Sequence, residues 1–178
     1  MARVGLPFLL GHAEIAYLFE VERQTSRKWR TEGTLAEPDL VISGNPYWLL
    51  DTVLRINGVG GRRISPQRLA AYQAAIPGGQ EATTIDELPV IVGLKEVARI
   101  HGRDDQAVSR WRNRRQISEP DILLSGSPLW LLETILRDGQ RRGRTIFDHE
   151  VQRLREGHRD PQKPRGRRTA TQHTRRRQ

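Results

Sequence analysis

The chain has 178 residues, of which 36% are hydrophobic and 29% charged, and this composition is typical of a soluble globular protein with one domain or two small ones. Its net charge of +9 favours a polyanionic partner, either nucleic acid or an anionic membrane surface. The absence of cysteine excludes disulfides, thiolate metal sites and cysteine nucleophiles.

The basic charge is concentrated at the C-terminal end. Residues 1–80 carry a net +2 and residues 81–155 a net +1, whereas residues 156–178 carry a net +6. The apolar run at residues 4–10 is too short to span a bilayer and lacks a small-residue cleavage site, so we expect neither a membrane anchor nor a signal peptide. We expect a cytoplasmic protein, located at the bacterial nucleoid if its partner is DNA.

An internal repeat with a constant offset of 82 residues organises the chain. Residues 10–72 align with residues 92–154 without a gap, and all four tryptophans occupy equivalent positions. The most alike stretches are EPDLVISGNPYWLLDTVLR and EPDILLSGSPLWLLETILR, which begin at Glu37 and Glu119. The repeat predicts a first domain at 1–75, a linker at 76–89, a second domain at 90–156 and a tail at 157–178. The Pro-Gly-Gly sequence in the linker predicts a short, partly flexible connection.

Each copy is predicted to begin with two short helices joined by a turn. In the first copy, apolar periodicity indicates a helix over 14–19, a break at 20–22 and a second helix over 23–31. In the second copy, we expect a helix over 96–101, a turn at Gly102, and a helix capped by Asp104 or Asp105 that ends near residue 113. This order predicts a helix-turn-helix, with the tryptophans in the core.

The pattern then changes to the period of a β-hairpin. Residues 40–42 and 47–49 are short apolar runs separated by a turn-forming Ser-Gly-Asn-Pro sequence. Pro46 and Pro128 lack the N–H group of a ladder, so we expect them at the hairpin tip or on an edge. Asp51 or Thr52 is expected to start a short helix with Val53 and Leu54 inward. The Ser-Pro sequence at 65–66 predicts the start of a last helix that ends near residue 75, with its counterpart over 147–155.

This order of elements, with the runs AEIAYLFEVERQTSRKWR and GNPYW, resembles the MerR-like and excisionase-like (AlpA-type) DNA-binding modules of bacteria, phages and plasmids. The resemblance covers residues 11–56 and 93–138. It implies a mainly α fold with small β-hairpins, and together with the repeat it predicts two winged helix-turn-helix domains in tandem. It also implies sequence-specific binding of duplex DNA, by a transcriptional regulator or an excision or maintenance factor of a phage, plasmid or chromosome. Glu20 departs from the family's turn glycine, and Ser26 departs from the buried valine that Val108 supplies.

The exposed N-terminal part of the second helix reads the major groove in such modules. In the first copy the candidate DNA-binding residues are Arg23, Gln24, Thr25, Arg27, Lys28 and Arg30. In the second copy they are Gln106, Ala107, Ser109, Arg110, Arg112 and Arg114. A solvated helix face would carry similar polar residues, and the repeat and the resemblance favour the functional interpretation. Because the two sets differ, we expect the copies to read different half-sites.

The hairpin tips and the tail supply further candidates. Small polar groups at Ser43, Asn45, Ser125 and Ser127 can meet phosphates, although a tight turn accounts for them equally well. The tail has almost no apolar residue, which predicts disorder. Its KPRGRR sequence, with Arg165, Arg167 and Arg168, resembles an AT-hook that enters the minor groove. A non-specific basic tail that adds affinity by counterion release is the alternative.

The sequence does not favour an enzyme. The five histidines are scattered without ligand spacing, and there is no phosphate-binding loop, nucleophile elbow or dinucleotide fingerprint. We therefore expect no cofactor, no metal and no membrane partner. A non-specific architectural protein of the nucleoid type, or an RNA-binding protein, is the alternative function. Two linked modules can act as a monomer, because linkage gives the second a high effective concentration, and self-association on DNA stays open.

Overall fold

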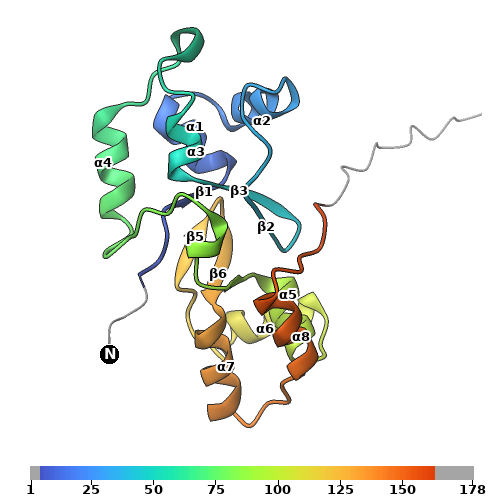
Figure 1. Ribbon diagram of the computed structural model, residues 1–178. Helices are drawn as coiled ribbons and strands as arrows, with labels where there is room; N and C mark the ends of the chain where they lie inside the picture. Colours follow the sequence, from blue (N-terminus) through green and yellow to red (C-terminus); the bar gives the residue numbers. More distant parts are fainter. Residues whose placement is uncertain (1–4, 163–178) are drawn as a thin grey trace, which may run out of the picture.

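A computed structural model describes residues 5–162 of the chain. In this range the fold is mixed α and β, with eight α-helices and two small three-stranded antiparallel sheets. Figure 1 shows the first half of the protein (residues 5–75) above the second half (residues 90–156), with the hairpins between them.

The two halves contain the same order of helices and strands. The first half comprises β1 (Leu9–Leu10), α1 (His12–Phe19), α2 (Arg23–Thr31), β2 (Leu40–Ile42), β3 (Asn45–Leu49), α3 (Leu50–Leu54) and α4 (Pro66–Ala74). The second comprises β4 (Ile91–Val92), α5 (Leu94–Ile100), α6 (Asp105–Asn113), β5 (Ile122–Leu124), β6 (Ser127–Leu131), α7 (Leu132–Arg141) and α8 (Asp148–Arg155). Short 3-10 helices η1 (Val59–Gly61) and η2 (Ile85–Glu87) lie in the connections.

Several local predictions about the helices are confirmed. The helix α2 has the predicted bounds. Asp104 caps α6 because its side chain accepts a hydrogen bond from the Ala107 N–H at 2.7 Å. Ser65 caps α4 in the same way, with proline in the first turn. These features are set by neighbouring residues, which is why the sequence alone reveals them.

The turn between the first two helices requires a left-handed backbone in both halves. Gly102 has a φ of +60°, which glycine adopts without steric cost, and the equivalent Glu20 has a φ of +55°. Glutamate at the position where the second half has glycine therefore places a strained residue in a turn of the same backbone conformation. An ion pair at 3.3 Å joins Glu20 to Arg68 of α4.

Each sheet has one more strand than the predicted hairpin. The strand β1 pairs with β3 at Leu9↔Leu49 and Leu10↔Trp48, so that β3 lies between β1 and β2, and β4 pairs with β6 in the equivalent way. Two residues are too few to show the alternation that marks a strand, so β1 could not be predicted from the sequence. Pro46 lies in β3, the central strand, and pairs with Val41 of β2. On its other side β3 pairs with β1 only at Trp48 and Leu49, so no ladder partner faces Pro46 there.

One prediction about the burial of side chains is wrong. Val53 and Leu54 were both expected inside, and Val53 is buried, but Leu54 is 37% exposed. Trp29, Trp48 and Trp130 are buried as predicted, and the half-buried Trp111 packs against the apolar cluster around Trp130. The indole N–H of Trp48 donates to the Ala36 carbonyl oxygen at 2.8 Å.

The molecule has three apolar clusters. One lies within each half, around Trp48 and around Trp130. The third is shared, and it is formed by Leu9, Ile42, Tyr47, Leu49, Ala82, Ile91, Leu124 and Leu129. Ala82 of the connecting segment belongs to this shared cluster and Ile76 to that of the first half. The connection therefore packs onto the body of the protein, unlike the partly flexible linker predicted.

Candidate nucleic-acid interface

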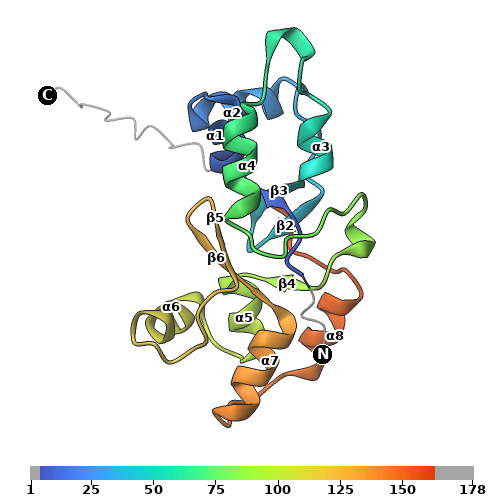
Figure 2. The ribbon, with the colours of Figure 1, turned by 90° about the vertical axis from the view of Figure 1, so that its left-hand side faces the viewer.

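The tip of each hairpin docks on the other half of the protein. The β5–β6 hairpin reaches the N-terminus of α1 (Figures 1 and 2). There the backbone N–H and the hydroxyl of Ser125 each donate to the Glu14 carboxylate at 2.6 Å. The Ala13 N–H in turn donates to the Ser125 hydroxyl oxygen at 3.1 Å. A carboxylate with several donors of this kind forms strong, charge-assisted hydrogen bonds.

The reverse contact joins the equivalent residues. The Ser43 N–H donates to Glu96 at 2.7 Å, the Ser43 hydroxyl donates to the same carboxylate, and the Lys95 N–H donates to the Ser43 oxygen at 3.0 Å. Because each contact recurs with the halves exchanged, the halves have the self-complementary geometry of a two-fold symmetric dimer within one chain. We call these two reciprocal contacts the joint.

The joint explains several identities between the repeats that the sequence left unassigned. A Cβ atom at Gly11 would lie 2.2 Å from the Ser125 hydroxyl oxygen, and one at Gly93 would lie 2.4 Å from that of Ser43. Glycine is therefore required at both places by the hairpin of the other half. The recurrence of glycine, glutamate and serine in both repeats was the available signal, but it does not by itself distinguish a contact within a copy from one between the copies.

This docking changes the interpretation of the hairpin tips. The predicted phosphate contacts of Ser43 and Ser125 need free N–H and hydroxyl groups, but those groups are engaged by Glu96 and Glu14. The other two candidates meet each other, because the Asn45 amide donates to the Ser127 hydroxyl at 3.4 Å. The tips are therefore primarily contacts between the halves.

The helix α2 has an exposed polar side and a side that is buried in the protein. Arg23, Gln24 and Lys28 are exposed, whereas Trp29 and Ser26 are buried. The Ser26 hydroxyl lies 2.8 Å from the His12 Nδ1 atom, so a polar pair occupies the place that Val108 fills in the second half. The predicted reading residues at the start of α2 are thus accessible, apart from the half-buried Thr25.

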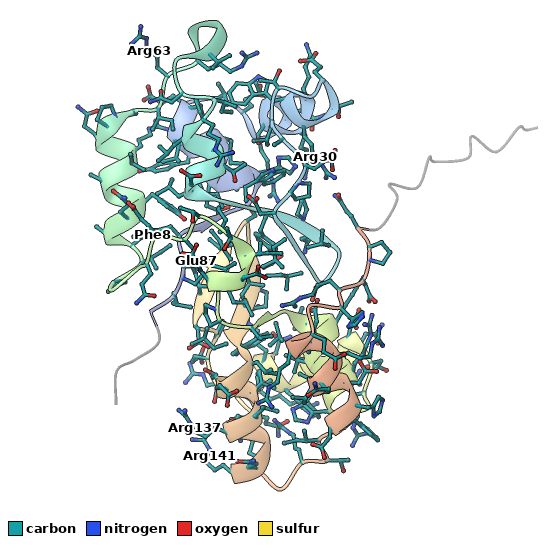
Figure 3. All side chains as sticks on the ribbon, viewed as in Figure 1. Phe8, Arg30, Arg63, Glu87, Arg137 and Arg141 are labelled. Atoms are coloured by element: carbon teal, nitrogen blue, oxygen red, sulfur yellow. The ribbon has the colours of Figure 1, made fainter. Side chains whose placement is uncertain are left out.

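The arginines of α2 face the hairpin tips and the C-terminal segment. Arg23 donates to the Ser125 carbonyl oxygen at 3.5 Å, and Arg27 is half-buried. Arg30 pairs with Glu37 at 3.4 Å and also donates to the Gln162 side chain. Figure 3 shows Arg30 between α2 and the end of the described C-terminal segment. Lys28 pairs with Glu32 at 3.6 Å on the exposed surface, which contributes little stability.

The helix α6 offers a different set of side chains. Gln106, Arg110 and Arg114 are exposed, and the half-buried candidates are Ala107, Ser109 and Arg112. Figure 2 shows α2 in the upper half of the molecule and α6 at the left edge of the lower half. The two halves thus carry unlike polar helices at equivalent places of the repeat.

Arginines of the second half are engaged elsewhere. The buried Asp138 pairs with Arg141 at 2.8 Å, Arg142 at 3.0 Å and Arg144 at 3.1 Å. Burial alone would raise the pKa of Asp138, but hydrogen bonds from Arg142, Ser118 and Arg141 outweigh it and hold that pKa below its ordinary value. Arg144 also lies 3.9 Å from the centre of the Trp111 ring. This cluster therefore stabilises the end of α7.

The predicted tail begins later than expected. Residues 157–162 contact both halves, through an ion pair of Asp160 with Arg99, the 3.8 Å approach of Arg159 to Glu96, and the contact of Gln162 with Arg30. The prediction of disorder from residue 157 is wrong for this segment, because its polar side chains find ionic partners. Arg165, Arg167 and Arg168 lie outside the described residues.

Among residues 5–162, no group of histidine, aspartate and glutamate side chains is arranged to hold a metal ion. No helix in that range is both long and apolar enough to cross a bilayer. Comparison with known proteins gives no relative: no protein-family model, no curated protein and no solved structure matches this chain.

Proposed function

We propose that this protein binds duplex DNA in a sequence-specific manner, through two winged helix-turn-helix modules whose reading helices are α2 and α6. The observation that carries the proposal is the recurrence of a polar, arginine-bearing second helix, partly exposed, at the equivalent place in each half. An α-helix fits the major groove, and arginine and glutamine can each make paired hydrogen bonds with a base edge.

The joint adds support of a different kind. A dimeric helix-turn-helix protein presents two helices at a fixed separation to two half-sites. Here the reciprocal hydrogen bonds and the shared apolar cluster hold two such helices in one chain. The unlike side chains of α2 and α6 favour a composite site with two different halves. Such a protein would serve in transcriptional control, or in the excision or maintenance of a phage or plasmid.

The test is the selection of bound duplexes from random DNA at near-physiological salt with the full chain. We expect a bipartite motif with two unlike halves. Retention of every duplex alike would contradict sequence-specific recognition and favour a non-specific architectural role. Preferential retention of RNA would contradict duplex DNA as the partner, because the deep major groove of RNA excludes a reading helix.

A further inference from the structure

A cleft of about 830 Å³ lies between α2 and the tips of both hairpins. Its wall on α2 contains Arg23, Arg27 and Arg30, which lie on one face of the helix because they are four and three residues apart. The opposite wall contains Ser43 and Ser125 with their neighbours in the turns. The cleft therefore exists only because the hairpins of both halves meet in front of α2.

The lining of the cleft favours an anion. Three guanidinium groups line it, and Glu37 is the one acidic residue among its described lining residues. The Glu37 side chain is 86% exposed, so its pairing with Arg30 is open to solvent and easily exchanged for another anion. Guanidinium groups bind phosphate oxygens through paired hydrogen bonds, which makes a phosphate group the best match.

Tyr47 provides a second, independent observation. It lines the cleft and is 1% exposed, and its hydroxyl makes no hydrogen bond of regular geometry with the described residues. Burial, aided by the Glu14 and Glu96 carboxylates, raises the pKa of Tyr47 to about 12, against the opposing effects of the Ser127 hydroxyl and Arg23. The phenol is therefore neutral at ordinary pH, and because its contact with Ser127 falls short of regular hydrogen-bond geometry, a ligand that accepts from it would satisfy a buried donor.

The second half lacks the same residues. Positions equivalent to Arg23, Arg27 and Tyr47 are occupied by Asp105, Ser109 and Leu129, although Arg112 matches Arg30. The anion-binding side chains thus belong to the first half alone, even though the fold around them is repeated. If these side chains only supported the fold, the second half, which has the same order of helices and strands, would be expected to carry them too.

We propose that this cleft is a binding site for a phosphate group, held by Arg23, Arg27 and Arg30 and by the Tyr47 hydroxyl. The group belongs either to a DNA backbone or to a free phosphorylated ligand of nucleotide size, since ligand pockets commonly measure about 300–1,000 Å³. The inference does not require that the protein reads base sequence.

The test is a titration of the full-length, isotopically labelled protein with pyrophosphate at constant ionic strength. Amide and arginine side-chain signals are followed by nuclear magnetic resonance. We expect saturable shifts at Arg23, Arg27 and Asn45, and about tenfold weaker binding for both Arg23→Gln and Tyr47→Phe. Arg137→Gln is the matched control, because it removes an arginine charge from α7, at the opposite end of the molecule (Figure 3), and should leave the affinity unchanged.

Duplex DNA then identifies the source of the phosphate. Displacement of pyrophosphate by duplex assigns the site to the DNA backbone, and simultaneous binding assigns it to a free ligand. No saturable shift at these residues with either probe, or equal affinities for all variants, would overturn the proposal. Pyrophosphate binding without duplex binding would leave the cleft in place and remove the proposed function, so the two failures are distinguishable.

Discussion

Gly11 and Gly93 have extended backbones, with φ of −95° and −109°, so their own dihedral angles do not require glycine. The requirement comes from the serine hydroxyl of the other half, which would lie within 2.4 Å of a Cβ atom at either position. A residue identity shared by two repeats can therefore record a contact between the repeats as well as a feature within each.

The first prediction concerns this contact. Gly11→Ala should lower the free energy of unfolding by about 1–3 kcal/mol, because the new methyl group clashes with the Ser125 side chain. Urea denaturation of Gly11→Ala, Ser125→Gly and the double variant measures the effect. The double variant should lose less stability than the sum of the single losses, because the shorter side chain removes the clash. Strict additivity would contradict a direct contact.

A second prediction concerns His101, which stands where the first half has Phe19. Burial lowers the pKa of His101, and Arg144 acts in the same direction against the Thr145 carbonyl and Asp138. The unfolded chain therefore binds a proton near pH 6.5 that the folded protein does not bind. Stability should be fully present above that pH and should fall as the pH drops below it.

Comparison of urea unfolding at pH 7.5 and pH 5.5, taken as values about one unit on either side of the ordinary histidine pKa, checks this expectation. His101→Phe should remove part of the loss of stability at the lower pH. His149→Gln is the control, since the His149 side chain is 70% exposed and should leave the pH dependence unchanged. An identical pH dependence in His101→Phe and the parent protein would exclude His101 as its source.

At the scale of single elements, α2 and α6 occupy equivalent positions of the repeat, but their exposed side chains differ. Both are nine residues long, and both bury one face against the core. The exposed start of α2 carries Arg23 and Gln24, and that of α6 carries Asp105 and Gln106. The sequence predicted these helices well because the signals that mark them, such as the Asp104 cap of α6, lie within a few residues.

The third prediction tests whether each helix reads its own half-site. Gln24→Ala and Gln106→Ala should change base preference at different positions of the selected motif, at a cost of about 1–3 kcal/mol for the preferred base. Selection with each variant, after circular dichroism has confirmed its folding, measures this. Equal loss of affinity on every sequence would mean that neither glutamine reads a base.

Other elements could not be predicted from local pattern. The strands β1 and β4 have two residues each, and their pairing with β3 and β6 depends on segments about 40 residues away. For the strands, the deciding information is the position of a distant segment. Leu54 is apolar but 37% exposed, and its residue type alone does not show this.

At the scale of the whole molecule, the joint fixes α2 and α6, the two proposed reading helices, relative to each other. A partly flexible linker between independent modules would allow variable spacing of half-sites. The shared apolar cluster and the contacts of Glu14 and Glu96 instead hold the halves as one body. The separation of α2 and α6 is therefore a property of the fold.

This rigidity leads to a fourth prediction, which rests on the proposed function. Insertion of about five base pairs between the half-sites, roughly half a turn of DNA, should weaken binding about tenfold or more, because one helix then faces away from its half-site. Gel-shift titration measures the effect. Glu14→Ala combined with Glu96→Ala should restore tolerance by releasing the joint. Equal affinity of the parent protein for both spacings would contradict a rigid frame.

The fifth prediction concerns the basic C-terminal residues. Deletion of residues 163–178, which contain seven of the 30 lysines and arginines, should flatten the dependence of DNA affinity on salt concentration, because fewer counterions are released. Residues 157–162 are kept because they contact both halves. Fluorescence anisotropy at several salt concentrations gives the slope. An unchanged slope would mean that this segment does not contact phosphates.

The sequence by itself determined the repeat, the bounds of α2, the helix caps and the turn in each hairpin, because each of these depends on residues a few positions apart. Only the tertiary structure decided what the repeated Ser-Gly hairpin contacts. Ser125 lies 111 residues from Glu14 and Ser43 lies 53 residues from Glu96, so no local pattern connects them. The physical reason is that two charge-assisted hydrogen-bond networks and a shared apolar core form only when the halves meet.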